Sequence, residues 1–224
     1  MFKKIIFCLS TTTCLIAQSE NDSLSIDPSY LEDQIYVGLT YNVFSNTPDS
    51  FVQDGFAYGV AVGFIKDIPF NEQRNIGIGI GLGYTFNTYI QNLGGTDDML
   101  VQNFTTKAYS DTYTINTNSF ELPIEFRWRT STLEKYKFWR IYTGINISYV
   151  FNSNAIGLSG DELVDIQVLT LERWQYAYTL AAGYGTWNFY MNYSFVPFFD
   201  KNSVFESEKL NMNTFRLGVM FYLL

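Results

Sequence analysis

The sequence predicts an all-β protein, a transmembrane antiparallel up-and-down β-barrel of about eight strands. Three observations lead to this fold class. Aromatic residues make up 18% of the 224 residues, and charged residues make up only 16%. No apolar run approaches the roughly 20 residues of a membrane-spanning helix. Large apolar residues alternate with small or polar ones along several segments, as in strands with two unlike faces.

The N-terminus has the layout of a secretory signal peptide, with two lysines before a short apolar stretch. Cleavage after Ala17 would make residues 1–17 the leader. The residues that follow are polar and acidic, and we expect residues 18–33 to form a periplasmic lead-in. The barrel is predicted over residues 34–224.

The first four strands follow from alternation with a period of two. Residues 35–43 read IYVGLTYNV, and residues 56–64 read FAYGVAVGF. In residues 76–87, IGIGIGLGYTFN, glycine occupies every second position up to residue 83. Residues 120–129 read FELPIEFRWR, which places four charges on one face.

The last four strands repeat this scheme. Residues 140–151 read RIYTGINISYVF, and residues 174–184 read WQYAYTLAAGY. Residues 187–195 read WNFYMNYSF, and residues 214–223 read TFRLGVMFYL. A tilted strand of about this length crosses the hydrocarbon layer of a membrane, and an even number of strands returns both ends to one side.

The predicted connections alternate in length, as short periplasmic turns and longer outer loops do in outer-membrane barrels. A very tight turn is expected at residues 185–186. In chain order the connections are residues 45–55, 66–73, 92–117, 130–138, 152–171, 185–186 and 197–212.

The large apolar face is expected to meet lipid. The interior of an eight-stranded barrel is only just wide enough to be filled by side chains, so the bulky face would overfill it. Glycines and small polar residues fit a narrow lumen, and a closed sheet leaves no backbone hydrogen bond unmade in lipid. Aromatic residues at the strand ends would form interfacial belts, although tryptophans could also cap a soluble core. The belt residues are Trp128, Trp139, Trp174 and Trp187.

Six charged residues fall on the lumen face of the predicted strands. Buried charges are costly unless they pair, so we expect a network of ion pairs. Two interpretations remain, a gate for solutes and a plug that fills the barrel, and we favour the plug. The residues are Glu121, Glu125, Arg127, Arg129, Arg140 and Arg216.

Composition argues against several other functions. Both cysteines, Cys8 and Cys14, lie in the expected leader, so the mature chain would lack a disulfide, a thiolate nucleophile and a cysteine metal ligand. Bulky Thr13 disfavours Cys14 as a lipid-modified residue. The leader removes 2 of 14 basic residues and none of 22 acidic ones. The net charge therefore falls from −8 to −10, which disfavours nucleic-acid binding.

We expect no enzyme, no cofactor and no metal site. The chain contains no histidine, so a Ser-His nucleophile is impossible. Six lysines fall in predicted turns or loops, away from a lumen site. The glycine run of residues 77–83 has the spacing of a strand face rather than of a nucleotide-binding turn. The long connections are acidic and could attract divalent cations or a basic partner, but no spacing in them resembles a calcium loop.

The C-terminal strand resembles the pattern read by the outer-membrane assembly machinery, which is polar, x, Gly, two residues, aromatic, x, hydrophobic. Arg216, Gly218, Phe221 and Leu223 match it. The chain departs from the pattern at its last residue, Leu224, where an aromatic residue is more common.

Several segments resemble the PorT-like outer-membrane β-barrel family of Bacteroidetes-type bacteria. They are residues 36–39, 77–84, 121–127 and 139–149. The resemblance implies location in the cell outer membrane and an association with protein secretion by the type IX system. These motifs are mostly strand patterns, so they specify architecture better than activity.

The leading hypothesis is a non-catalytic outer-membrane barrel that is a structural or accessory component of an envelope assembly, linked to type IX secretion. The alternative is a porin-like small-solute channel, and a lipid-modifying enzyme is third. The expected partners are outer-membrane lipid and lipopolysaccharide, the assembly machinery and secretion-system proteins.

Overall fold

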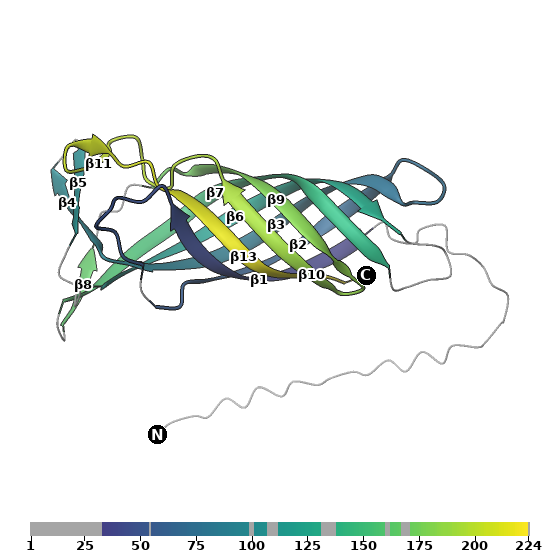
Figure 1. The fold of residues 1–224 in the computed structure, drawn as a ribbon, viewed down its shortest axis with the longest axis horizontal. Coiled ribbons are helices and arrows are strands. Elements are labelled where there is room, and N and C mark those ends of the chain that lie inside the picture. The colour runs from purple at the N-terminus through teal and green to yellow at the C-terminus, as the bar shows by residue number, and fades with distance from the viewer. Residues whose placement is uncertain are drawn as a thin grey trace, which may run out of the picture.

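The computed structural model describes residues 33–53, 55–98, 101–106, 112–130, 138–159, 162–166 and 171–223. Eight of its strands form one closed antiparallel barrel, because each pairs with the next and the last pairs with the first (Figure 1). They are β1 (Asp33–Ser45), β2 (Tyr58–Pro69), β3 (Ile76–Gln91), β6 (Thr112–Arg129), β7 (Trp139–Ser159), β9 (Trp174–Tyr184), β10 (Trp187–Ser194) and β13 (Asn213–Leu223). The predicted fold class is confirmed.

Five shorter strands lie beyond one end of the barrel (Figure 1). A four-stranded sheet in the order β12-β11-β5-β4 contains β4 (Leu93–Asp98), β5 (Val101–Thr106), β11 (Ser203–Phe205) and β12 (Glu208–Lys209). The fifth strand, β8 (Glu162–Ile166), pairs with the last residues of β7. Within the described part of the chain, no helix is long and apolar enough to span a bilayer.

The barrel has two different ends. The connections β2–β3, β6–β7 and β9–β10 are short, and they lie at the same end as the C-terminus, which we call the short-turn end. The connections β1–β2, β3–β6, β7–β9 and β10–β13 are longer, and we call the opposite end the long-loop end. The tight turn expected at residues 185–186 joins β9 to β10.

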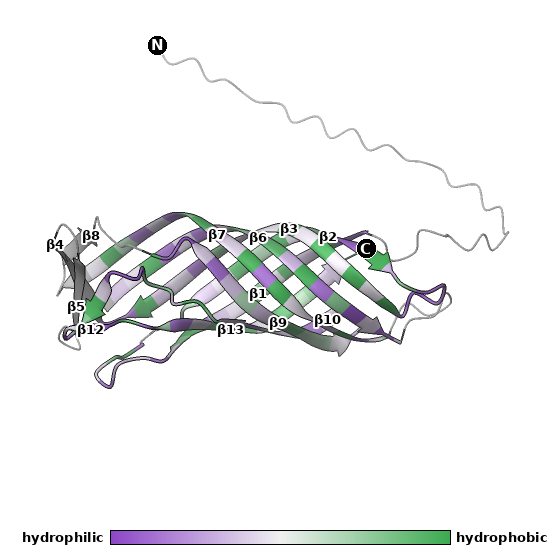
Figure 2. Ribbon diagram, turned by 90° about the horizontal axis from the view of Figure 1, so that it is seen from above, coloured by the Kyte–Doolittle hydropathy of each residue, from purple (hydrophilic) through white to green (hydrophobic). Residues whose placement is uncertain are grey.

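The alternation of the sequence sets which side chains point inward. In β1, Ile35 is 52% exposed and Tyr36 is 3% exposed, and the burial pattern continues with a period of two. Bands of hydrophobic and hydrophilic residues alternate along the barrel strands in Figure 2. Large apolar side chains therefore cover the outer surface, as expected for a surface that meets lipid.

Several expected boundaries were wrong. Residues 66–73 were expected to form a turn, but β2 continues to Pro69, because Lys66 and Asp67 still pair with β3. The lead-in was expected to include Asp33, which already belongs to β1. The rest of the expected lead-in and the leader lie outside the described residues.

The long connections are also more ordered than expected. Residues 92–117 contain β4, β5 and the start of β6, and residues 152–171 contain the end of β7 and all of β8. Residues 197–212 contain β11 and β12. These residues lack a continuous apolar face, but a backbone ladder can form between polar strands because its hydrogen bonds do not depend on side-chain type.

Candidate functional site

The lumen is the candidate functional site, because the barrel gathers its buried charges there. It was expected to be lined by glycines and small polar residues, but large side chains also point inward, among them Tyr36, Tyr142, Tyr190, Tyr222 and Met220. Glycines on neighbouring strands make room for them. A methyl group at Gly83 would overlap the hydroxyl of Tyr36, and one at Gly79 would overlap the guanidinium of Arg127.

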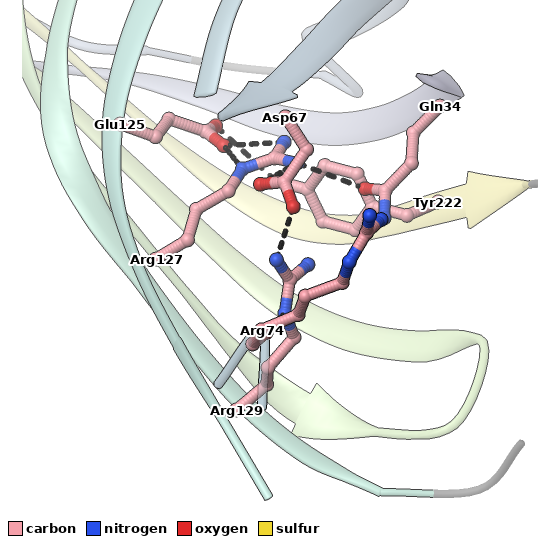
Figure 3. Close-up of polar contacts among 7 residues, drawn as sticks. All are labelled: Gln34, Asp67, Arg74, Glu125, Arg127, Arg129 and Tyr222. Atoms are coloured by element: carbon pink, nitrogen blue, oxygen red, sulfur yellow. Dashed lines mark hydrogen bonds and ion pairs between the residues drawn. The ribbon is translucent and has the colours of Figure 1, made fainter. Parts of the chain in front are cut away.

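Arg127 lies at the centre of a charge cluster near the short-turn end (Figure 3). Its side chain is fully buried. Its Nε and Nη2 donate to Oε2 of Glu125 at 3.1 and 2.9 Å. Its Nη1 donates to Oδ1 of Asp67 at 3.3 Å and to Oε1 of Gln34 at 3.1 Å. One guanidinium thus holds two carboxylates and an amide from three strands.

Asp67 joins this cluster to Arg129. Nη2 of Arg129 forms an ion pair with Oδ2 of Asp67, and its Nε donates to the carbonyl oxygen of Arg74 at 2.6 Å. The hydroxyl of Tyr222 donates to Oε1 of Glu125 at 3.3 Å. Both carboxylates are therefore held from more than one side, which is the condition under which buried charges are tolerated.

A second ion pair lies further along the lumen. Nη2 of Arg216 lies 3.1 Å from Oε1 of Glu121, and both side chains are buried. Nε of Arg216 donates to Asn192 at 3.2 Å, and Nη1 donates to Asn87 at 3.5 Å. No carboxylate links this pair to Arg127 among the described residues, so the six predicted residues do not form one network.

Arg140 lies beside the Arg127 cluster, as the register partner of Arg129, but it is not ion-paired with a described carboxylate of either group. Its Cζ is 4.6 Å from the ring centroid of Phe138, 5.9 Å from that of Tyr142 and 5.8 Å from that of Tyr222. Its described neighbours are therefore mainly aromatic faces, which attract a cation but carry no net charge to neutralise it.

Sequence analysis missed Asp67 as a site residue. The lumen-facing positions of β2 include Gly63 and Ile65, and Asp67 continues the same period of two. The alternation was ended at residue 64, because Lys66 and Asp67 were read as the start of a turn. Extending the strand by three residues would have placed the carboxylate of Asp67 inside.

The long-loop end of the lumen is closed by a hydrophobic cluster, which we call the aromatic plug. Ring centroids of Phe44, Tyr89 and Phe198 lie 4.9 to 5.2 Å apart. Residues from the β10–β13 connection fold inward onto residues of the strands. The plug consists of Phe44, Tyr89, Leu93, Ile115, Ala155, Phe198, Phe199, Leu210 and Met212.

Two small cavities lined by described residues lie in the lumen, among the plug and the buried charges. The first offers about 30 Å³ to water-sized spheres, and Glu121 and Arg216 are among the residues that line it. The second offers about 10 Å³ and is lined in part by Tyr36 and Glu125. A water needs roughly 10–15 Å³ on this scale, so these spaces suit a few waters and no larger solute.

The four tryptophans expected to form interfacial belts lie on the outer surface. Trp128, Trp139 and Trp187 lie at the short-turn ends of their strands, and Trp174 lies at the long-loop end of β9. All four are between 40% and 66% exposed. In the β7–β9 ladder, Trp139 opposes Tyr184 at one end, and Tyr149 opposes Trp174 at the other. Both pairs are in ring contact, at 5.4 and 4.9 Å.

The four residues of the C-terminal pattern divide between the two faces of β13. Arg216 points inward, and Leu223 is 45% exposed on the outside. Phe221 packs on Trp187, with ring centroids 4.8 Å apart. A methyl group at Gly218 would meet the backbone of β1, the strand that closes the barrel.

Lys66, one of the six lysines expected in turns or loops, was expected to begin the connection at residues 66–73 but lies in β2. Its Nζ forms an exposed ion pair with Asp33 at 3.3 Å on the outer face. Among the described residues, no group of three or more acidic, cysteine or histidine side chains is arranged to hold a metal ion.

Comparison with known proteins gives a family and distant structural likenesses. A family model described as outer membrane protein beta-barrel domain matches residues 16–222. The crystal structure of Ail, the attachment invasion locus protein of Yersinia pestis, is 12% identical, and the match covers 86% of this chain and 98% of Ail. The TM-score is 0.33. No curated protein matches the chain.

Proposed function

This chain belongs to the outer membrane protein beta-barrel domain family, and on that premise we propose that it is a non-catalytic barrel that serves an envelope assembly as a structural or accessory component. It is a protein of the cell outer membrane. The proposed role excludes solute transport, and the surfaces that remain for function are the long-loop end and the lipid-facing wall.

The filled lumen is the observation that carries this proposal. The aromatic plug occupies the long-loop end, and the ion pairs of Arg127, Arg129 and Arg216 occupy the rest. A porin-like channel would need a continuous aqueous path. The lumen cavities of about 30 and 10 Å³ accommodate isolated waters only.

The long-loop end is the surface we assign to partners. The four-stranded sheet β12-β11-β5-β4 gives this end a fixed backbone shape. Beneath it, the β10–β13 connection is held by backbone hydrogen bonds, including Phe198 N to Met212 O at 2.7 Å and Glu172 N to Phe198 O at 3.1 Å. An ordered surface loses less conformational entropy on binding than mobile loops lose.

The proposed link to type IX secretion rests on the PorT-like resemblance of strand segments such as residues 77–84 and 121–127. The proposed partners are secretion-system proteins, together with the lipid and lipopolysaccharide around the barrel and the machinery that reads its C-terminal strand. The absence of histidine supports a non-catalytic role, since it removes the usual general base.

Two experiments in the native host test this role. One deletes the gene, and the other crosslinks single-cysteine variants of the protein to their neighbours. The mature chain is expected to lack cysteine, so Glu208→Cys would place a single thiol at the long-loop end. Glu72→Cys, in the β2–β3 turn, is the matched control at the other end. We expect a defined protein adduct from Glu208→Cys alone and impaired export of type IX cargo in the deletion strain.

Each half of the proposal has its own contrary result. Normal export of all type IX cargo without the barrel would remove the secretion link. The accessory role would be contradicted if Glu208→Cys formed no crosslinked adduct and the deletion strain also kept an unchanged envelope composition.

A further inference from the structure

The buried charges of the described lumen do not balance. Three carboxylates and four arginines are buried, and every one of those carboxylates is paired with an arginine other than Arg140. One positive charge is left over. The carboxylates are Asp67, Glu121 and Glu125, and the arginines are Arg127, Arg129, Arg140 and Arg216. A buried cation without a counter-charge is strongly unfavourable.

The unbalanced charge lies directly opposite another arginine. Arg129 and Arg140 are register partners in the β6–β7 ladder, and both point inward. Directly opposed residues have Cβ atoms roughly 4.5–5.5 Å apart, where like charges destabilise a sheet. Arg129 ends β6 and Arg140 is the second residue of β7, so the pair lies at the short-turn mouth of the lumen.

Both guanidiniums have N–H groups without a partner. Nη1 of Arg129 and Nε of Arg140 are buried and donate to no acceptor among the described residues. Nε2 of Gln34, near the same mouth, is also buried and unpartnered. The rings of Phe138 and Tyr142 face the Arg140 guanidinium, but such contacts use its flat face and leave the N–H groups at its edge unbonded.

We propose that a small oxyanion binds between Arg129 and Arg140 at the short-turn mouth of the lumen, accepting hydrogen bonds from the free N–H groups of both. Guanidinium groups suit carboxylate and phosphate oxygens, because their N–H groups form a planar fork. One bound anion would neutralise the excess charge and relieve the repulsion across the β6–β7 ladder. Inorganic phosphate is the probe we choose, and acetate is its carboxylate counterpart.

Anion-dependent stability of the refolded full chain in detergent tests the site. Urea unfolding is compared in chloride, phosphate and acetate at equal pH and ionic strength, for the wild type and for Arg140→Gln. We expect phosphate and acetate to raise the wild-type urea midpoint and to have a smaller effect on Arg140→Gln. In chloride, Arg140→Gln should unfold at a midpoint equal to or above that of the wild type, because it removes an unpaired charge.

Arg216→Gln is the matched control, because it removes a buried arginine that already has a carboxylate. Arg216→Gln should lower the urea midpoint in every salt, because it leaves Glu121 buried without its ion-pair partner. It should keep the wild-type increase of the midpoint in phosphate. Phosphate also stabilises proteins by exclusion from their surface, so only the difference between variants counts. Equilibrium dialysis should show phosphate bound at least about tenfold more weakly by Arg140→Gln, as expected for loss of a charged hydrogen-bond donor.

Two outcomes would overturn the proposal. Equal responses of the wild type and Arg140→Gln would mean that phosphate acts on the whole surface. A wild type that responds to neither phosphate nor acetate would mean that no oxyanion binds between Arg129 and Arg140, and a response gained by Glu134→Gln would then identify Glu134 as the counter-charge. Glu134 belongs to residues 131–137, which lie outside the described residues.

Discussion

Asp67 is the residue on which the charge cluster depends most, because one carboxylate pairs with both Arg127 and Arg129. Replacing it by asparagine would leave two buried guanidiniums short of counter-charge. We expect Asp67→Asn to lower the free energy of unfolding by about 3–5 kcal/mol, the range for breaking a buried ion pair. Urea unfolding of the barrel refolded in lipid vesicles measures this change.

Asp33 provides the matched control, since it is also a strand carboxylate in an ion pair. Its side chain is 57% exposed, and its partner Lys66 is 58% exposed. We expect Asp33→Asn to change the free energy of unfolding by less than about 1 kcal/mol. Similar losses from both variants would show that Asp67 is not shielded from water as described.

Tyr36 and Gly83 are packed too closely for a side chain at position 83. We expect Gly83→Ala to destabilise the barrel by about 1–3 kcal/mol through overpacking. Tyr36→Phe should be nearly neutral, because the Tyr36 hydroxyl is buried without a hydrogen-bond partner. The double variant Gly83→Ala/Tyr36→Phe should regain at least half of the unfolding free energy that Gly83→Ala alone loses. The reason is that the Tyr36 hydroxyl is the atom nearest the new methyl group.

Gly144 is the control for this double-mutant cycle. A methyl group there would meet the backbone of β6, which no side-chain truncation can relieve. Gly144→Ala and Tyr36→Phe should therefore be additive in the unfolding free energy, whereas Gly83→Ala and Tyr36→Phe should be coupled. Additivity in both cycles would contradict the described packing of the lumen.

The alternation of the sequence predicts which side chains face the lumen, but not which of them contact one another. A period of two assigned Glu121, Glu125 and Arg127 to the inner face, where the structure also places them. It carries no information about which inward side chains meet, because partners such as Gln34 and Arg127 are 93 residues apart in the chain. Pairing depends on strand register, which is set by the whole closed sheet.

At the level of elements, we propose that the β7–β9 ladder spans the membrane. The ring pairs Trp139–Tyr184 and Tyr149–Trp174 close its two ends. Ten residues at about 3.3 Å each, tilted by about 40°, span roughly 25 Å, which is the height of the apolar band of such barrels. β7 continues to Ser159 and therefore projects beyond the band.

Substitutions at two outward positions of β7 test this placement. Ile145 lies between the two ring pairs and is 47% exposed, whereas Ile156 lies beyond them and is 38% exposed. We expect Ile145→Lys to cost about 2–4 kcal/mol of unfolding free energy in vesicles and Ile156→Lys about 0–1 kcal/mol. Equal costs would place the membrane boundary elsewhere on this strand.

The part of β7 within the band could be predicted from the sequence, but its extension could not. Within the band, the outward positions other than Thr143 are apolar or aromatic, so the pattern is regular. Beyond it, residues 152–159 read NSNAIGLS, because water can solvate both faces. A bulge adds to the difficulty, since Asn118 opposes Asn152 while Ser119 opposes Val150, which leaves Phe151 unpaired and shifts the alternation by one residue.

At the level of the whole molecule, the pairing of β1 with β13 closes an eight-stranded barrel, and the size of that barrel sets how much space the side chains must fill. An eight-stranded barrel encloses a space that side chains can fill, and here the Arg127 cluster, the Arg216–Glu121 pair and the aromatic plug occupy it in turn. The eight strands were predictable from local alternation. The plug was not, because Phe198 and Phe199 belong to a connection whose inward folding depends on distant residues of β1 and β3.

The electrical conductance of the purified barrel in a planar lipid bilayer tests the filled lumen most directly. A shift in gel mobility on heating first establishes that the inserted protein is folded, and a known porin in the same bilayer shows that single channels are detectable. A filled lumen predicts no discrete current steps from the folded barrel at any applied voltage. Stable unitary currents that require the folded form would contradict the filled lumen and favour the porin-like alternative.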